Sequence, residues 1–529
     1  MKTMKFKKIA LTSLTALALL ASCSREDDPA PKPDPKPDPP VTTITPDKIN
    51  DFVWKAMNSW YYWQKDAPNL GDTKLAPPND YATFINGKSP DKLFYELLFE
   101  YGKTDFFSWI ENDNTIVSKA QYVAEEQSTS GLEIAVLGKG DGTGRYVALV
   151  NYIIPNSSAD KAGLKRGDVI TKVNGQYLVS SNYSQLFGGS FNLTRAETAS
   201  YDDTSGKIFT TDKEESIAIS KTMVEENPIA YYKVFKEAGR TIGYLVFNGF
   251  KIDYNDELNA QFAQMKADGV NELILDLRYN GGGSLDTAVG LAQMINGSFT
   301  GGKYVYLDFN EKHNQYDEFD TLSDKIDIYN IVDGHEEETG EVQQINSLTL
   351  PKIYALVSFQ TASASELTVT SLKKYIDVEV IGYLTVGKFV GSHTLYDSPT
   401  SDFLNYENRS KDHKWQLQPI TFAYYNKDKD PHPKVRLDDN SIVPGIIPDK
   451  AENFISPFEW VGKVKEFGNP SDPELGRALE IITGKSLSKK ASMRSRAILT
   501  NRGGAKLLSK PMSAAKGLYI SDVSQFRKP

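Results

Sequence analysis

The first folded stretch of the chain has apolar residues at helical spacing. Between residues 49 and 114, large apolar side chains recur every three or four positions around residues 52–63 and again around residues 93–98. This is the spacing of one face of a helix, so we predict a small N-terminal helical domain over residues 49–114. Its aromatic residues are more typical of a packed core than of a ligand cage; they are Trp54, Trp60, Tyr61, Tyr62, Trp63, Phe94, Tyr95, Phe107 and Trp109.

Residues 115–226 follow a different pattern, with short apolar runs bounded by Gly, Asn and Asp. The runs YVALVNYII and DVITKVNG are typical of strands. The segment PNSSADKAGLKRGDVITKVNGQYL predicts a short helix ending at Gly163, then a strand closed by an Asn174-Gly175 turn. This string resembles the PDZ domain, which adds a peptide as an extra strand at a sheet edge. The resemblance implies that Gly131 and Leu132 of SGLEI supply amides for the peptide carboxylate. A plain β-domain is the alternative.

Residues 227–465 alternate between strand-like and helix-like segments. TIGYLVFNGF and NELILDLRYNGGG indicate buried strands, and DELNAQFAQMKADG has helical periodicity. KIYALVSFQTASASELTVTSLKKY predicts a strand, a turn and a helix, and VEVIGYLTVGKFVGS predicts a strand that continues past a glycine. Such alternation is typical of an α/β core. The acid-rich residues 301–345 are expected to form a surface insertion. Residues 466–529 are expected to form a C-terminal extension, with a helix at DPELGRALEIITGK.

The N-terminus carries the pattern of an export signal. A basic start and the apolar run IALTSLTALALLAS, shorter than the roughly 20 residues of a spanning helix, indicate a signal peptide over residues 1–22. Cys23, the single cysteine, stands where the lipobox of bacterial lipoproteins places its lipidated residue. We expect lipidation of Cys23, with an ordinary signal peptide as the alternative. A proline-rich tether over residues 23–48 follows.

The expected location is the bacterial cell envelope, as an outer-membrane lipoprotein. The acidic run just after Cys23 resembles the surface-export signal of Bacteroidetes lipoproteins, and a solvated linker explains it equally well. The periplasmic and the external face therefore both stay open.

Composition narrows the possible partners and cofactors. The chain has 529 residues and a formal net charge of −9 at pH 7, which argues against nucleic acid. A single cysteine leaves no disulfide and no cysteine-based zinc site. The five histidines lack metal-ligand spacing such as HExxH. We therefore predict no metal, no cofactor, and membrane contact through the lipid anchor alone.

Three stretches carry candidate chemistry, and each has an ordinary structural alternative. In TASASE, small neighbours allow a tight turn that projects the Ser363 hydroxyl, although Ser363 and Glu366 also match a helix capping box. Lys388 lies among apolar residues, where burial would lower its pKa and make it a base for a serine hydroxyl, unless its stem reaches water. The glycines of DLRYNGGG let amides approach a ligand as an oxyanion hole, or form a flexible turn.

Together these stretches resemble the carboxy-terminal processing, or tail-specific, serine proteases. DLRYNGGG, TASASE, a lysine 25 residues after the middle serine, and the later GIIPD carry the resemblance, with a PDZ domain as the expected neighbour. The match covers about residues 120–455 and implies a multidomain α/β protein with a serine peptidase core of the ClpP/crotonase type. It implies Ser363 as nucleophile, Lys388 as general base, and the amides of Gly283 and Ala364 as oxyanion hole.

One position departs from the family pattern. Many members have a glutamine four residues after the lysine, which helps to orient it, whereas this chain has Ser392 there, followed by His393. Along a regular strand an offset of four keeps the same face and an offset of five reverses it. We therefore expect Ser392 to take part of the orienting role and His393 to point away.

The predicted function is a serine endopeptidase acting on protein or peptide tails through an acyl-enzyme. A second hypothesis keeps the scaffold without the chemistry, as a lipoprotein that binds a hydrophobic ligand or a peptide. The presence of Ser363, Lys388 and both oxyanion stretches favours the peptidase.

Overall fold

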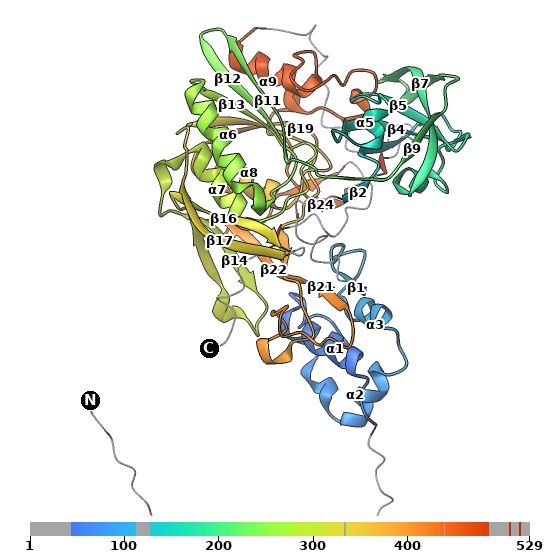
Figure 1. The fold of residues 1–529 in the computed structure, drawn as a ribbon, viewed down its shortest axis with the longest axis vertical. Coiled ribbons are helices and arrows are strands. Elements are labelled where there is room, and N and C mark those ends of the chain that lie inside the picture. The colour runs from blue at the N-terminus through green and yellow to red at the C-terminus, as the bar shows by residue number, and fades with distance from the viewer. Residues whose placement is uncertain are drawn as a thin grey trace, which may run out of the picture. The chain divides into compact units, whose positions relative to one another are not determined.

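The computed structural model describes residues 44–112, 127–332, 335–437 and 440–485, and the short segments 507–508 and 518–519. The predicted signal peptide, the lipidation of Cys23 and residues 23–43 of the predicted tether lie outside the described residues. Within the described ranges, no helix combines the length and apolar composition that crossing a membrane requires. Figure 1 shows the fold, coloured along the chain.

The N-terminal region is helical and has an aromatic core, as the spacing predicts. Its first helix follows Asp47, whose carboxylate accepts a hydrogen bond from the Asn50 amide at 2.9 Å, and Trp54, Trp60 and Tyr61 are fully buried. The elements are α1 (Lys48–Trp60), η1 (Asp72–Leu75), α2 (Pro78–Ile85), α3 (Pro90–Leu97) and β1 (Trp109–Asn112). Strand β1 pairs antiparallel with β21 (Trp415–Gln418), which comes about 300 residues later in the chain.

The second region is a β-rich domain with the predicted short helix and Asn-Gly turn. The backbone turns at Gly163, with φ at 73°, and at Asn174 and Gly175, with φ at 49° and 77°. The elements are β2 (Gln127–Thr129), β3 (Leu132–Gly138), β4 (Tyr146–Ile153), α5 (Ser158–Lys161), β5 (Val169–Val173), β6 (Gln176–Tyr177), η2 (Tyr183–Phe187), β7 (Ser190–Asp202), β8 (Lys207–Asp212), β9 (Ile217–Ser220) and β10 (Thr222–Val224).

Strand β3 begins at Leu132, within SGLEI, and pairs with β4 on one side. On its other side it pairs antiparallel with β25 (Leu507–Leu508), a segment of the chain's own C-terminal part. The edge at which a PDZ domain adds a peptide strand therefore already carries a short strand.

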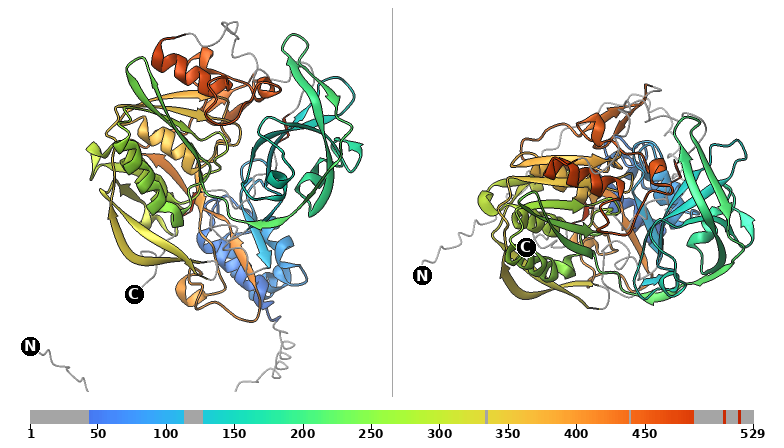
Figure 2. Two further views of the ribbon diagram at one scale, coloured as in Figure 1. Left: turned by 45° about the horizontal axis from the view of Figure 1, so that its top comes forward. Right: turned by 90° about the horizontal axis from the view of Figure 1, so that it is seen from above.

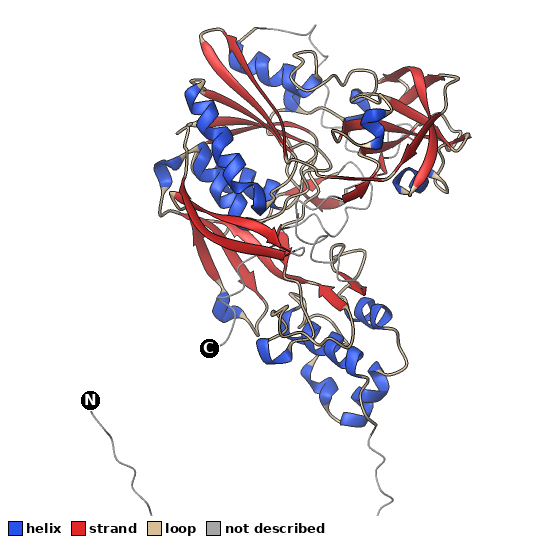
Figure 3. Ribbon diagram, in the orientation of Figure 1, coloured by secondary structure: helices blue, strands red, loops and turns tan. Residues whose placement is uncertain are grey.

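The third region is built on a sheet of five strands in the order β11-β12-β13-β18-β19. Strands β12, β13, β18 and β19 are parallel, and helices cover both faces (Figure 3). The strands are β11 (Ile229–Glu237), β12 (Arg240–Phe247), β13 (Glu272–Asp276), β18 (Lys352–Val357) and β19 (Asp377–Gly382), and the helices are α6 (Asn255–Ala267), α7 (Leu285–Ile295), α8 (Ala364–Leu372) and α9 (Pro473–Thr483). The predicted α/β core is confirmed.

The side chains of β13 explain how the sheet is covered. Leu273 and Leu275 pack into the core shared with α6, α7 and α8, while Ile274 packs with Leu475 and Leu479 of α9. Because successive strand residues face opposite sides, this alternation places α9 on the face opposite to the other three helices. The predicted helix in the C-terminal extension thus exists, and it closes one face of the core.

A second sheet of five strands has the order β15-β14-β22-β20-β26, and α8 contacts strands of both sheets. Figure 2 shows the helices beside it. Its members are β14 (Lys303–Phe309), β15 (Glu318–Thr321), β20 (Val390–Ser392), β22 (Ile420–Asn426) and β26 (Leu518–Tyr519), and the hairpin β16 (Lys325–Val332) and β17 (His335–Gln344) forms a sheet of its own. The remaining elements are β23 (Lys434–Arg436), β24 (Ile442–Pro444), η3 (Ile252–Tyr254), η4 (Gly297–Phe299), η5 (Asn314–Tyr316), η6 (Pro399–Ser401), η7 (Ala451–Asn453) and η8 (Pro457–Trp460).

The expectation of a surface insertion over residues 301–345 is wrong for its first strand. β14 lies inside the second sheet between β15 and β22, and Val305, Leu307 and Phe309 are buried. The alternating apolar positions of KYVYLDF carry the strand signal, which the acidic residues after it obscured.

Candidate active site

Ser363 occupies the turn between β18 and α8. Its backbone has φ 59° and ψ −115°, outside the regions that residues with a side chain usually adopt. Such a conformation persists only where the surroundings impose it, and it is frequent at functional sites. The residue is fully buried, and its amide donates a hydrogen bond to the Glu366 carboxylate at 2.9 Å. The sharp, strained turn is the arrangement expected of a nucleophile elbow.

The glycine turn of DLRYNGGG packs directly against this elbow. A Cβ on Gly282 would lie 2.8 Å from the Ser363 Cβ and 3.0 Å from the Ala364 nitrogen, and one on Gly283 would lie 2.2 Å from the Phe250 carbonyl oxygen. With φ at 105° and 142°, both positions require glycine. The backbone of the glycine turn therefore lies directly against the backbone of the elbow. Of the predicted oxyanion residues, Gly283 belongs to the glycine turn and Ala364 to the elbow.

Asn280 locks the glycine turn to the elbow. Its side-chain oxygen accepts a hydrogen bond from the Gly282 amide at 2.9 Å, and its backbone oxygen accepts from the Ala362 amide at 3.1 Å and the Ser365 hydroxyl at 3.0 Å. The two stretches that the sequence placed far apart are thus joined by hydrogen bonds.

Lys388 lies in a loop, which corrects one expectation. The strand predicted over VEVIGYLTVGKFVGS is two strands, β19 and β20, separated by residues 383–389. Gly387 has φ at 81°, and a Cβ there would lie 2.6 Å from the Pro444 carbonyl oxygen. The Gly387 amide donates to the Glu366 carboxylate at 2.7 Å, so a side chain rather than a strand ladder holds this backbone. The segment is apolar enough for a strand, but these contacts decide otherwise.

Two side chains bridge Ser363 and Lys388. The Glu366 carboxylate accepts the amides of both Ser363 (2.9 Å) and Lys388 (2.8 Å). The Tyr424 hydroxyl lies 2.9 Å from the Ser363 carbonyl oxygen and 2.6 Å from the Lys388 carbonyl oxygen. Glu366 and Tyr424 are both buried, and burial raises the pKa of each. The predicted nucleophile and the predicted base are therefore held by the same pair of residues.

The amine of Lys388 is removed from water. The side chain is only 1% exposed, and its Nζ lies 4.9 Å from the centre of the Phe107 ring. Burial lowers the pKa of Lys388 to about 8, although the negative charges of Asp105 and Glu366 act in the opposite direction. A lysine with this pKa has an appreciable neutral fraction near neutral pH, which a general base requires.

Ser392 and His393 follow the loop and have separate partners. The Gln418 amide donates to the Ser392 hydroxyl at 2.8 Å, so a glutamine from β21 reaches this position from another strand. The strand pairing shifts register between Gly391 and Ser392, and Lys388 precedes β20, so the regular-strand argument for Ser392 does not apply. An orienting role for Ser392 stays a prediction.

His393 lies in an aromatic pocket. Its Nδ1 is 2.8 Å from the Thr421 hydroxyl, and the rings of Trp60, Phe309 and Phe422 surround it at centroid distances of 5.5, 6.1 and 5.5 Å. Burial lowers the pKa of His393 to about 3, so the ring is neutral at physiological pH.

The predicted carboxylate-binding loop of the β-rich domain is engaged within the domain. The amide of Gly131 donates to the Thr129 hydroxyl at 3.1 Å, and the amide of Leu132 approaches the Ser130 hydroxyl at 3.4 Å. A Cβ on Gly131 would lie 2.0 Å from the Ser157 Oγ, so packing within the domain already requires a glycine at this position. A role of Gly131 and Leu132 in binding a peptide carboxylate stays a prediction.

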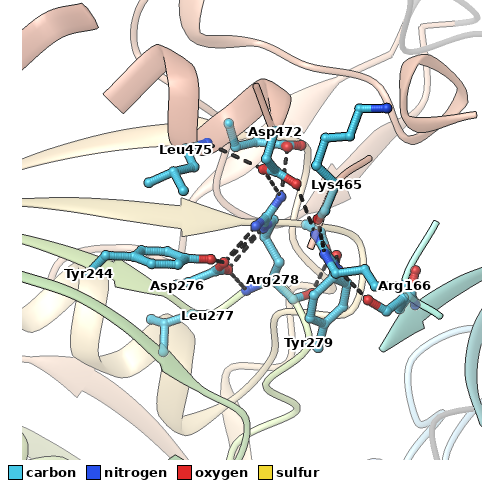
Figure 4. Close-up of polar contacts among 12 residues, drawn as sticks. Arg166, Tyr244, Asp276, Leu277, Arg278, Tyr279, Lys465, Asp472 and Leu475 are labelled. Atoms are coloured by element: carbon cyan, nitrogen blue, oxygen red, sulfur yellow. Dashed lines mark hydrogen bonds and ion pairs between the residues drawn. The ribbon is translucent and has the colours of Figure 1, made fainter. Parts of the chain in front are cut away.

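A buried ion cluster connects the β-rich domain to the strand that leads into the glycine turn (Figure 4). Arg278 pairs with Asp276, Asp472 and Glu474 at 2.6 to 2.8 Å. Arg166, from the turn after α5, pairs with Asp472 at 3.1 Å and donates to the Tyr279 hydroxyl. Arg166, Arg278 and the acids they contact are nearly or fully buried. The cluster therefore anchors the β-rich domain, α9 and the glycine turn to one another.

Three family models match successive parts of the chain. They are the Peptidase S41 N-terminal domain over residues 48–109, the PDZ domain over residues 149–187 and Peptidase family S41 over residues 241–419. Residues 241–419 are therefore a peptidase family S41 domain. The family match starts at β12 of the S41 core and ends at β21, so it includes Ser363, Lys388 and the glycine turn.

Individual relatives agree with this assignment. A Staphylococcus epidermidis protein named "Probable CtpA-like serine protease" is 27% identical over 233 residues, which are 44% of this chain and 40% of that protein. A Staphylococcus aureus protein of the same name is 26% identical over 277 residues, 51% of this chain and 49% of that protein. The chain thus spans at most about half the length of these curated relatives.

A solved structure supports the fold. The crystal structure of a Bacteroides fragilis protein assigned to the S41 proteases matches with a TM-score of 0.58 and 23% identity, covering 82% of this chain and 97% of that one. At this identity the likeness concerns the fold alone. It is consistent with the helical N-terminal domain, PDZ domain and S41 core described above.

Several residues around the site were not identified from the sequence. The sequence indicates Glu366 only as a helix cap, although its position close after Ser363 is a signal that the two residues are in contact. Tyr424, Asp105 and Phe107 have no local motif, because their relation to Lys388 arises only when distant segments pack together. A lone acid in the aromatic YGKTDFFSW was the one hint that Asp105 is unusual.

Proposed function

We propose that this S41 chain is a serine endopeptidase in which Ser363 is the nucleophile and Lys388 the general base. The observation that carries the proposal is the double bridge: Glu366 and Tyr424 each bind the backbone of both residues. A buried lysine whose pKa is lowered to about 8 can accept the serine proton.

The reaction then follows from these groups. Neutral Lys388 removes the Ser363 hydroxyl proton as the oxygen attacks a peptide carbonyl, and the amides of Gly283 and Ala364 stabilise the oxyanion that forms. The lysine returns the proton to the leaving amine. Water, activated by the same base, then releases the acyl group. Because Ser363 is buried in this conformation, a substrate must first displace part of its cover.

Recruitment is proposed for the PDZ domain. An extended peptide tail would add to the edge of β3, where β25 pairs at Val136 and Leu137, so the tail must displace that segment. Contact between the domain and the segment before the elbow supports a path between the two: the side-chain Nδ2 of Asn151 donates to the Gln360 side-chain oxygen at 2.8 Å. We also propose the envelope location and the Cys23 lipid anchor.

The test combines covalent labelling with hydrolysis of a fluorogenic peptide. Replacing Ser363 by Ala should abolish both labelling by a serine-reactive probe and turnover. The matched control is Ser365→Ala, in the same turn, which loses one hydrogen bond to Asn280 and should still label. Turnover of Ser363→Ala within tenfold of wild type would remove Ser363 from the mechanism.

The base is tested on the same substrate across pH 6 to 10. Lys388→Arg should be as inactive as Lys388→Ala, because a guanidinium stays protonated. His393→Ala should keep most activity, since His393 contacts Thr421 and an aromatic pocket. An active Lys388→Arg enzyme together with an inactive His393→Ala enzyme would favour a Ser-His arrangement instead.

A further inference from the structure

The N-terminal domain reaches the amine of Lys388. The Phe107 ring centre lies 4.9 Å from Lys388 Nζ, within the distance at which a ring attracts a cation. Phe107 belongs to the loop between α3 and β1, which lies in the segment matched by the S41 N-terminal domain. A domain that contributes none of the predicted catalytic residues therefore covers the predicted base.

The same loop carries a fully buried carboxylate. Asp105 is 0% exposed, and it accepts hydrogen bonds from the Tyr61 hydroxyl at 2.8 Å and from the amides of Phe107 and Ser108 at 2.9 Å. A buried carboxylate needs such hydrogen-bond donors, because burial without them is costly. The negative charge of Asp105 acts on Lys388 and favours its protonated form.

Asp105 differs from the other carboxylate that acts on Lys388. Glu366 raises the pKa of Lys388 less than Asp105 does. Its two carboxylate oxygens accept the backbone amides of Ser363, Gly387 and Lys388. Glu366 thus fixes the backbone around Ser363 and Lys388, whereas Asp105 is the main opposite charge that acts on the Lys388 amine.

The loop is fixed to the core next to the catalytic segments. The Ser108 hydroxyl accepts the Ile420 amide at 2.9 Å, and the Tyr62 amide donates to the Ile420 carbonyl oxygen at 2.8 Å. β1, which begins at Trp109, pairs with β21. Residue 420 also starts β22, the strand that carries Tyr424. Loop and base are therefore fixed to one strand by direct hydrogen bonds.

We propose that the N-terminal domain is a working part of the active site, in which Asp105 and Phe107 position the amine of Lys388 and set its charge. Both are positioning residues, because they act through Lys388 rather than on the substrate. The inference rests on the proposed role of Lys388 as the base. It implies that the domain controls the pH range in which the peptidase works.

The decisive variant is Asp105→Asn. The asparagine oxygen can still accept the Phe107 and Ser108 amides, so the loop geometry is retained while the charge is removed. Without that charge, protonated Lys388 is less favoured, its pKa falls, and the neutral base is present at lower pH. An opposite charge that acts on a buried group can shift its pKa by about one unit. We therefore expect the acid limb of kcat/KM to move down by about one pH unit, a roughly tenfold gain at pH 6.

Two controls separate charge from structure. Tyr61→Phe removes a hydrogen bond to Asp105 but leaves its charge, so the acid limb should stay in place even if the protein is less stable. Glu100→Gln removes an exposed charge from the same loop and should leave the profile unchanged. If Asp105→Asn and Tyr61→Phe reduce activity equally at every pH with one common midpoint, the loop is merely structural and the proposal is overturned.

A second readout is independent of catalysis. In protein carrying ¹³Cε-labelled lysine, the Lys388 signal is assigned by its loss in Lys388→Ala, and its titration is followed by NMR. The midpoint should be lower in Asp105→Asn than in wild type and unchanged in Glu100→Gln. An unmoved midpoint in Asp105→Asn contradicts the inference. A shifted midpoint in a protein that hydrolyses no peptide would support the positioning of Lys388 while overturning the peptidase function.

Discussion

The buried amine of Lys388 lowers the free energy of unfolding at any pH where the amine is protonated. Its ordinary pKa of about 10.4 is lowered to about 8 by burial, so between these values the unfolded chain binds a proton that the folded chain does not. The free energy of unfolding therefore increases as pH rises from 8 to 10.4, and below pH 8 the full penalty is present. The proposed general base therefore lowers the stability of the fold at neutral pH.

This linkage predicts the behaviour of Lys388→Met, which fills a similar volume without charge. The variant should be inactive, and its stability relative to wild type should be most favourable at pH 7. That relative stability should decline by about 3 kcal/mol between pH 8 and pH 10.4, as wild type is relieved of its penalty. Urea denaturation of both proteins at pH 7 and pH 10 measures the difference. A difference that does not change with pH would show that Lys388 has an ordinary pKa in the folded protein.

Among the helices and strands, α9 connects two domains through the residue that caps it. Asp472 caps it, accepting the Leu475 amide at 3.4 Å, and the same carboxylate contacts Arg278 and Arg166. Arg278 lies just before the glycine turn, and Arg166 lies in the PDZ domain. One side chain therefore stabilises a helix end and joins two domains (Figure 4).

Replacing Asp472 by Asn should be strongly destabilising. It leaves two buried guanidinium groups with one negative charge fewer, and breaking a buried pair in this way typically costs about 3 to 5 kcal/mol. Thermal or urea denaturation of the whole protein measures the loss. The control is Glu311→Gln, whose pair with Lys65 is about 70% exposed on both sides, and it should leave the midpoint unchanged. Equal effects of the two variants would mean that the cluster is not a structural anchor.

For the chain as a whole, the C-terminal segments lie on both parts of the proposed substrate path. β25 pairs with the edge of β3 in the PDZ domain, and β26 pairs with β20, which follows the Lys388 loop. A peptide that adds to β3 must therefore compete with an intramolecular strand, whose effective concentration is high.

Truncation after Lys485 should remove this competition. The core should remain folded, because α9 ends at Thr483 and is closed by Gly484 in the left-handed conformation. We expect tighter binding of a peptide with a free C-terminus, by about tenfold or more given typical effective concentrations, and faster turnover of that peptide. Fluorescence anisotropy and the hydrolysis assay measure the two effects. Unchanged affinity in a folded truncation variant would show that β25 does not occupy the binding edge.

Local sequence predicted most of the elements and the candidate residues. Apolar periodicity predicted α1 and α3. Turn-forming and small residues predicted the Asn174-Gly175 turn and the strand–turn–helix around Ser363. Each of these depends on interactions within a few residues. Small residues around Ser363 and the glycine run predicted a tight approach of backbone, which Gly282 and Gly283 confirm. The family pattern pointed to Lys388, because the lysine stands at a fixed spacing from the serine in that pattern.

Packing between distant segments decided what surrounds those residues. A strand was expected through Lys388, but the Glu366 carboxylate and the backbone near Pro444 hold a loop there. The charge state of Lys388 depends on burial and on Asp105, a residue from another domain. Desolvation and electrostatic attraction depend on distances in space rather than along the chain, so no local pattern contains them. The sequence therefore identifies the candidate reacting groups, and the folded chain sets their environment.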